Sequence, residues 1–282
     1  MMGSLVSYLI AMHDSAKPFV AGTPLGDARW PLVTLGAVVV FPLCLLDQRY
    51  LSCTSMVAFA VNIYLVAVVC AEFARRASSD SLPEGLCLVG AGTGSIAMLA
   101  ALAQCFIVQM CVLPMYEELQ SRSPRRFAQA LWVAFGILAV LFSLFAAAGY
   151  LAYGPAVNSN LLVSLPHSGA ADVARIGTIA VVAAVYPIMV IPMIAPLKNM
   201  DLRKRLGADA TDGAVDRYRR VVTTVAIVAI VLVSFLGALL IERLGFVTVV
   251  DGAICVGAFT GLGPGLVGLR MLGRSSFAWR FA

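Results

Sequence analysis

The chain has 282 residues, of which 61% are hydrophobic and only 12% are charged, with a mean hydropathy of +0.92 and a net charge of +5. An ordinary soluble domain has about 25% charged residues, so this composition excludes a soluble globular protein. The charge-free runs are long enough to cross a bilayer core of roughly 30 Å. We therefore expect an all-α, polytopic membrane helix bundle that forms a single transmembrane domain over residues 1–282.

Eight hydrophobic segments follow one another along the chain, and the first is too short to span a membrane. In order they are Met1–Met12, Trp30–Leu46, Leu51–Ala71, Leu86–Tyr116, Ala128–Tyr153, Ile176–Leu197, Val221–Ile241 and Gly245–Leu269. A cleaved signal peptide is the less favoured alternative for the first segment. No positively charged region precedes it and no small-residue cleavage site follows it.

The basic residues alternate between the loops that connect these segments. Fourteen of the 20 Lys and Arg residues fall in one alternating set of loops and six in the other. The positive-inside rule assigns the richer set to the cytoplasm and places both termini there. The run Arg203 to Arg220 is typical of such a loop, and a site for anionic lipid is the alternative. The net positive charge thus reports topology and does not indicate a nucleic-acid partner.

A few polar residues lie inside the hydrophobic segments, where they are costly and therefore functional candidates. They are Asn62, Gln104, Gln109 and Asp251, with Glu72 and Glu242 at segment ends. For Asn62 and Gln104, a helix-to-helix hydrogen bond and a transport role are equally compatible with the pattern. Asp251 is a weak candidate for carrying protons, and the alternative is an interfacial carboxylate near the extracellular start of the last segment.

Three prolines interrupt the helical pattern. Pro114, Pro187 and Pro192 lack the N–H that would bond the carbonyl four residues earlier. Carbonyls freed in this way are tolerated at membrane depth only where protein or a water-filled cavity satisfies them. Secondary transporters place substrate and ions at discontinuous helices of this kind. A proline kink used only for packing is the alternative.

Enzymatic and cofactor chemistry have little support in the sequence. The seven cysteines are odd in number and show neither a disulfide framework nor zinc-ligand spacing, so no metal site is predicted. There is no HExxH motif and no pair of carboxylates at membrane depth. The GAGTGS stretch, residues 90–95, lies in a hydrophobic helix pattern without the strand that a nucleotide fingerprint requires. We expect neither an enzyme nor a bound cofactor.

Three motifs together resemble the amino acid/auxin permease family. They are VLPMYEEL (Val112–Leu119), AAGYLAYG (Ala147–Gly154) followed by NSNLLVSLP (Asn158–Pro166), and FPLCLL before Leu51. The resemblance implies a LeuT-type inverted-repeat fold of the APC superfamily and transport of amino acids coupled to sodium or protons. Family members usually have about eleven spans, and the segments here resemble the third to the tenth. On this basis, counterparts of the first two helices and the last are missing.

The resemblance also implies a substrate site. Cys105–Leu119 resembles the sixth helix, whose broken middle faces the substrate, so we expect the pathway to be lined by Phe106, Gln109, Met110 and Tyr186. Family members commonly show a His near the position of Gln109. Glutamine can hydrogen-bond an amino acid but cannot titrate, which argues against a proton role there.

The segment Ile176–Leu197 resembles the eighth helix and departs from the sodium-coupled pattern. Sodium-coupled relatives place a hydroxyl residue just before the proline that matches Pro187, whereas this chain reads AAVYP with Ala183. A sodium site built from hard oxygen ligands loses a side chain there. Ala183 and Asp251 remain weak candidates for ion coupling, and proton-coupled or facilitative transport is favoured over sodium coupling.

The leading hypothesis is therefore a secondary transporter of the plasma membrane or of a vacuolar or lysosomal membrane. Its partners are an amino acid substrate, membrane lipid and a proton or sodium co-ion. The alternative, motivated by the missing first helix, is a truncated membrane protein that does not transport and acts as an interaction subunit or persists as a gene relic.

Overall fold

The computed structural model describes residues 1–23, 28–45, 52–79, 81–83, 85–87, 92–105, 112–120, 122–198, 200, 211–256, 258, 262–263 and 265–270. Within these ranges every regular element is a helix, which confirms the all-α prediction. The chain divides into two compact units. Unit 1 comprises Met1–Leu88 and Gly136–Leu244, and unit 2 comprises Val89–Phe135 and Gly245–Ala282.

In the described part of the chain, four helices are long and apolar enough to cross a membrane. They are α4 (Ser52–Ser78), α7 (Pro124–Tyr153), α9 (Gly169–Lys198) and α11 (Asp212–Leu240). At 1.5 Å per residue they extend roughly 40–45 Å, more than the thickness of a bilayer core. Each corresponds to one of the predicted hydrophobic segments.

The other helices are shorter. The first segment forms α1 (Met2–Ala16), which continues past Met12 into the short 3-10 helix η1 (Lys17–Phe19). The second forms α3 (Arg29–Leu45), and the last begins with α12 (Leu244–Val256). The count of eight membrane segments and the inverted repeat stay predictions.

The segment Leu86–Tyr116 is not helical throughout, because its first residues, 86 and 87, are not helical. It contains α5 (Thr93–Cys105) and α6 (Val112–Glu118), and residues 81–83 and 85–87 before them are not helical. Pro114 is the third residue of α6, and the carbonyl four residues earlier that it was expected to free lies outside the described part of the chain. Residues 106–111 are outside the described part of the chain.

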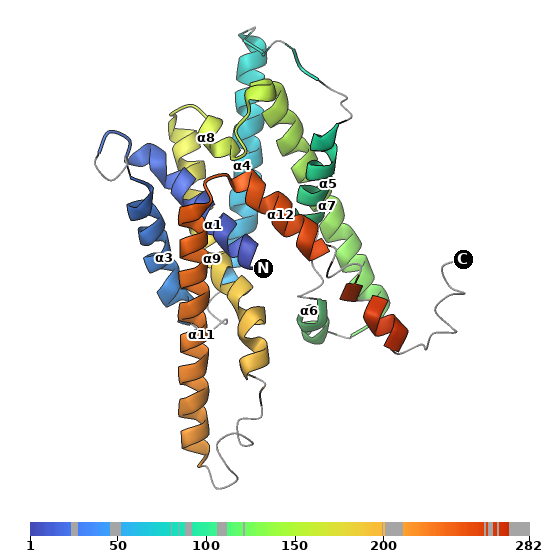
Figure 1. The fold of residues 1–282 in the computed structure, drawn as a ribbon. Helices are drawn as coiled ribbons and strands as arrows, with labels where there is room; N and C mark the ends of the chain where they lie inside the picture. Colours follow the sequence, from blue (N-terminus) through green and yellow to red (C-terminus); the bar gives the residue numbers. More distant parts are fainter. Residues whose placement is uncertain are drawn as a thin grey trace. The chain divides into compact units, whose positions relative to one another are not determined.

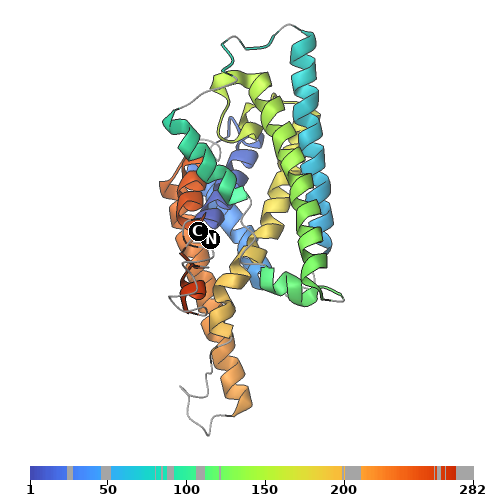
Figure 2. The same cartoon turned by 90° about the vertical axis from the view of Figure 1, so that its right-hand side faces the viewer.

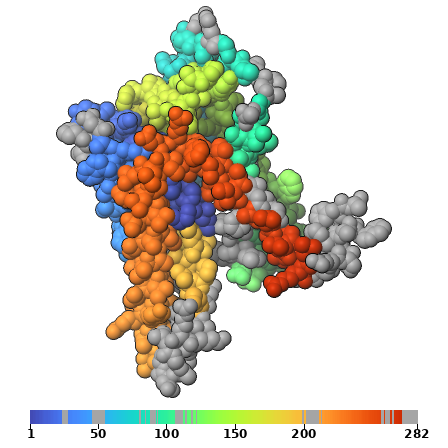
Figure 3. Space-filling model, in the orientation of Figure 1, coloured from blue at the N-terminus to red at the C-terminus, as the bar shows by residue number. Residues whose placement is uncertain are grey.

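At the centre of unit 1, α1 packs against α3, α9 and α11 (Figures 1 and 3). Leu5, Leu9 and Ile10 of α1 are at most 1% exposed. A helix that is apolar on most of its surface is buried among other helices. This explains why α1, although only 15 residues long, is ordered at the core.

A second apolar cluster of unit 1 joins α4, the second half of α7, the short helix α8 (Leu161–Ser164) and α9. Its small members are Val69, Ala148, Ala171 and Ala174. Leu161, Leu162 and Leu165 fill the space between the longer helices. Gly149 allows the close approach, because a Cβ there would lie 2.8 Å from the Leu161 side chain. Figure 2 shows α4 and the second half of α7 side by side.

Hydrogen bonds in unit 1 join helix ends that the charge alternation assigns to the same, non-cytoplasmic side. Arg29 at the start of α3 donates to the Ala238 and Ile241 carbonyls at the end of α11, at 3.1 and 2.8 Å. Arg76 near the end of α4 donates to the Ala152 carbonyl at the end of α7, at 3.2 Å. The alternation is therefore consistent within unit 1, while the cytoplasmic assignment stays a prediction.

The prolines of α9 do not interrupt the helix, and the expectation of a discontinuous helix at Pro187 and Pro192 is wrong. The helix runs from Gly169 to Lys198 with Pro187, Pro192 and Pro196 inside it. Each proline removes only its own N–H from the helical ladder, so the bonds of the flanking residues can maintain the helix around it.

Unit 2 contains a close contact between α5 and α12. A Cβ at Gly252 of α12 would lie 2.1 Å from the carbonyl oxygen of Ala100 in α5, and 3.2 Å from the Gln104 side chain. Only glycine permits two helices to approach so closely, as small residues do at membrane helix interfaces. Elsewhere in unit 2, the Tyr116 and Phe127 rings pack edge to face with centroids 5.5 Å apart.

Candidate functional site

The structure describes three of the six predicted site residues. Phe106, Gln109 and Met110 lie outside the described residues. Ala183 and Tyr186 lie on α9 in unit 1, and Asp251 lies on α12 in unit 2.

Tyr186 is fully buried where α9 meets α1 and α11. Its hydroxyl lies 2.5 Å from the hydroxyl of Ser234, which in turn donates to the Val231 carbonyl at 2.9 Å. The single hydroxyl proton of Ser234 is already used in the bond to the Val231 carbonyl. Tyr186 is therefore the donor, and Ser234 the acceptor, of the bond between the two hydroxyls. The Tyr8 ring of α1 packs against the Tyr186 ring at 6.5 Å between centroids. Tyr186 thus links three helices of the core.

Ala183 is 8% exposed and precedes Tyr186 by three residues, which places both on one face of α9. Its methyl side chain supplies no oxygen to a cation. The role of this position in ion coupling stays a prediction.

Asp251 and Gln104 meet inside unit 2. The Gln104 Nε2 donates to Asp251 Oδ2 at 2.8 Å, and the Cys255 thiol, one turn along α12, lies 3.3 Å from Asp251 Oδ1. Asp251 is 8% exposed. The close approach of α5 and α12 at Gly252 brings these groups together, because the two backbones are in contact one residue away. The structure therefore gives Gln104 the helix-to-helix hydrogen bond that the sequence left open.

Asn62 behaves differently from Gln104. Its side-chain amide donates to the Ala58 carbonyl of its own helix at 2.8 Å. The residue is exposed on α4 and makes this bond one turn back along the chain. An intrahelical bond of this kind satisfies the amide without a partner helix.

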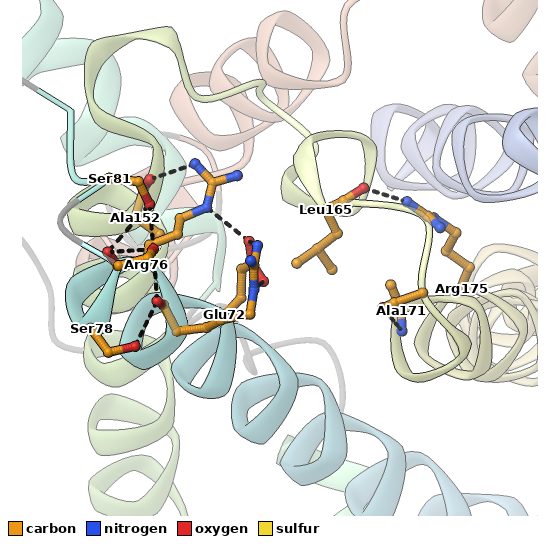
Figure 4. Close-up of polar contacts among 11 residues, drawn as sticks. Glu72, Arg76, Ser78, Ser81, Ala152, Leu165, Ala171 and Arg175 are labelled. Atoms are coloured by element: carbon orange, nitrogen blue, oxygen red, sulfur yellow. Dashed lines mark hydrogen bonds and ion pairs between the residues drawn. The ribbon is translucent and has the colours of Figure 1, made fainter.

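Glu72 is the centre of a charged cluster near the end of α4. It is 8% exposed and accepts hydrogen bonds from Arg75, at 2.9 and 2.8 Å, and from Arg76 at 2.8 Å. The Arg76 guanidinium also lies 4.2 Å above the centroid of the Tyr153 ring. One carboxylate thus balances one of two guanidinium groups, and the cluster keeps a net charge of about +1 (Figure 4).

Arg175 is a buried charge that sequence reasoning missed, because the tally of basic residues counted it as part of a loop. It is 1% exposed and donates to the Leu162 carbonyl at 3.1 Å and to the Leu165 carbonyl at 2.7 Å. It also pairs with Asp172 at 2.7 Å. The four-residue helix α8 ends beside it, and the last carbonyls of a helix need external donors. The Asp-x-x-Arg spacing in a helix was the available signal.

His13 is also more buried than its position at a segment edge indicates. It is 7% exposed, and its Nδ1 lies 3.0 Å from Asp14 Oδ1. The other oxygen of Asp14 accepts from the Asn160 amide at 3.4 Å, and Asn160 caps α8. In the part of the chain that the structure describes, no group of three or more His, Cys, Asp or Glu residues could hold a metal ion.

Comparison with known proteins identifies the family. The profile described as "Transmembrane amino acid transporter protein" matches residues 1–282. The chain is 22% identical to "Solute carrier family 38 member 10" of Rattus norvegicus over 240 residues, which are 81% of this chain and 22% of that protein. It is 24% identical to "Amino acid transporter AVT6E" of Arabidopsis thaliana over 306 aligned residues, covering 99% of this chain and 60% of the relative.

A third relative is "Sodium-coupled neutral amino acid transporter 7" of Xenopus laevis, with 25% identity over 260 residues, 90% of this chain and 56% of that protein. The chain thus spans at most about three-fifths of the length of these relatives. No solved structure matches.

The family is one of transporters, so the predictions of a non-enzymatic and integral membrane protein are confirmed. The resemblance inferred from the three sequence motifs is confirmed as well, over the full length of the sequence. The chain belongs to the transmembrane amino acid transporter protein family.

Proposed function

We propose that the protein moves amino acids across a membrane as a secondary transporter, either proton-coupled or facilitative. Family membership and the names of two relatives, which are those of amino acid transporters, support this. A plasma membrane or a vacuolar or lysosomal membrane is the proposed location. Sodium is the second candidate co-ion, because one of the relatives is named as a sodium-coupled transporter.

The observation that carries the proposal is the buried Asp251 carboxylate. It lies in the apolar helix α12 and accepts a 2.8 Å hydrogen bond from Gln104 of another helix. A buried ionisable group in an apolar helix is expensive to keep and is characteristic of proton and ion pathways. The Gln104 amide is a neutral donor that stabilises the charged carboxylate, and protonation removes the need for that bond. In this proposal Asp251 carries the coupled proton, and Gln104 positions its carboxylate.

The proposed substrate pathway is lined by Phe106, Gln109, Met110 and Tyr186. Tyr186 contributes a hydroxyl at the junction of α1, α9 and α11, where it is bonded to Ser234. A substrate carboxylate or amine can replace Ser234 as the partner of this hydroxyl. Ala183 contributes only a backbone carbonyl to ion coupling.

Uptake of labelled amino acids into proteoliposomes that contain the purified full chain tests the proposal. Uptake by the unaltered protein is expected to rise under an inward proton gradient. Asp251→Asn keeps an oxygen that accepts from Gln104 but cannot bind and release a proton. This variant is expected to lose the stimulation by the gradient and to retain exchange of amino acids in the absence of a gradient.

Asp216→Asn is the matched control. Asp216 is 62% exposed on α11 and lies 3.5 Å from Arg219, a surface pair that contributes little. Its removal should leave gradient-stimulated uptake unchanged. Full stimulation of Asp251→Asn would refute the proton role of Asp251. Failure of the unaltered protein to take up any amino acid, with either a proton or a sodium gradient, would refute transport itself.

A further inference from the structure

A groove with a volume of about 330 Å³ runs along α4 in unit 1, beside the connection from α8 to α9. Ala67, Val68 and Ala71 of α4 form one wall, and Leu165 and Pro166 contribute to the other. The groove is open along one side, because Ala67 and Ala71 are exposed. It lies on a helix that is long and apolar enough to span a membrane.

The groove has an apolar end and a cationic end. Tyr64 marks the first, where its hydroxyl donates to the Ala170 carbonyl at 3.1 Å. Arg75 marks the second. Eleven residues of helix separate them, a length of roughly 16 Å. A ligand that fills the groove is therefore elongated, with an apolar body and a head that lies beside Arg75.

The charges at the cationic end favour an anionic head. Glu72 is bonded to both Arg75 and Arg76, so the three groups carry a net charge of about +1. The Arg75 side chain is 63% exposed, and its Nε and Nη2 atoms donate hydrogen bonds to the Glu72 carboxylate. The Arg75 Nη1 is not used in this pair. A guanidinium binds phosphate oxygens in this geometry, and the Ser168 hydroxyl also lines the groove.

We propose that this groove binds an anionic glycerophospholipid, with its phosphate on Arg75 and one acyl chain along α4 toward Tyr64. A free amino acid fits less well. Both oxygens of Glu72 already accept from arginines, so no carboxylate remains to pair with an ammonium group. The apolar walls, in contrast, contact an acyl chain along its length.

The headgroup determines the preference of this site. An acyl chain in a bilayer is already removed from water, so its transfer into the groove adds little free energy. The contact between phosphate and guanidinium then distinguishes a lipid with a net negative charge from one whose choline compensates the phosphate. This inference does not depend on whether the chain transports amino acids.

Native mass spectrometry of the full chain in an uncharged detergent tests the proposal with phosphatidylglycerol as the probe. Phosphatidylcholine and inorganic phosphate are the comparison ligands. We expect phosphatidylglycerol to bind at least fivefold more tightly than phosphatidylcholine, and inorganic phosphate not to displace it. Arg75→Gln should weaken phosphatidylglycerol binding about tenfold, equivalent to about 1.4 kcal/mol. Arg219→Gln, which removes a basic residue of α11 that is 41% exposed, should not change it.

A second pair of variants fills space without a change in charge. Ala71→Phe places a ring in the groove and should reduce lipid binding about tenfold, whereas Ala74→Phe, at an exposed position of α4 that does not line the groove, should not. Equal lipid binding by Ala71→Phe, Arg75→Gln and the unaltered protein would overturn the proposal. Displacement by millimolar phosphate would overturn it too, since the site would then be one for a free anion.

Discussion

Replacement of Arg175 by alanine tests whether the buried arginine stabilises the junction of α8 and α9. The substitution removes the donors to the Leu162 and Leu165 carbonyls and the partner of Asp172. Loss of one member of a buried charged group costs about 3–5 kcal/mol. Asp172 is 37% exposed and can be rehydrated, so we expect a value near the lower limit, about 3 kcal/mol. Arg175→Lys keeps the charge but not the fork of donors and should cost about half as much.

The free energy of unfolding, measured by SDS titration in mixed micelles, is the appropriate assay. Hydrogen exchange of residues 161–165 adds a local readout, because protection there should fall more than in α11. Arg219→Ala is the control, since its pair with Asp216 is exposed and 3.5 Å long, and its cost should stay below about 1 kcal/mol. If Arg175→Ala costs no more than this control, the stabilising role of the buried arginine is refuted.

Two further substitutions address the helix contacts. Tyr186→Phe removes the bond to Ser234, which keeps its own bond to a carbonyl, so the unfolding free energy in SDS should fall by about 1 kcal/mol. An unchanged value would mean that the hydroxyl adds no net stability. Gly252→Ala forces α5 away from α12, because its Cβ would lie 2.1 Å from the Ala100 oxygen, and should cost about 1–3 kcal/mol in the same assay. Gly265→Ala, with open space around it, is the control, and equal effects of the two would contradict the close approach.

The long helices were predictable because their signal is local. Residues 128–153 and 221–241 carry no charge, and such a run has few alternatives to a membrane helix. The structure extends both helices at their N-terminal ends, to Pro124 and Asp212, through charged residues that the hydropathy pattern excludes. Helix formation requires only backbone bonds and a polar environment at the ends, so a helix can continue beyond its apolar run.

The contacts between side chains were less predictable. Gln104 and Asp251 were recognised separately as costly residues, but 147 positions separate them in the sequence. Nothing in the local pattern of either residue specifies the partner. The same holds for Arg175, because the carbonyls that satisfy it come from the irregular end of α8. Hydropathy describes the environment of one segment, while these bonds depend on how segments pack.

The central position of α1 has a consequence for biosynthesis. Its partners α9 and α11 follow it in the chain by about 150–240 residues, and the bonds of Arg29 to the end of α11 span 209 and 212 residues. At 5–20 residues per second, roughly 10–40 seconds pass between the synthesis of α1 and that of its last partner. During this interval the faces of Leu5 and Leu9 lack the helices that later cover them. Among the helices of this core, α1 is thus the one whose faces wait longest for their partners, and the insertion machinery or lipid must hold it until then.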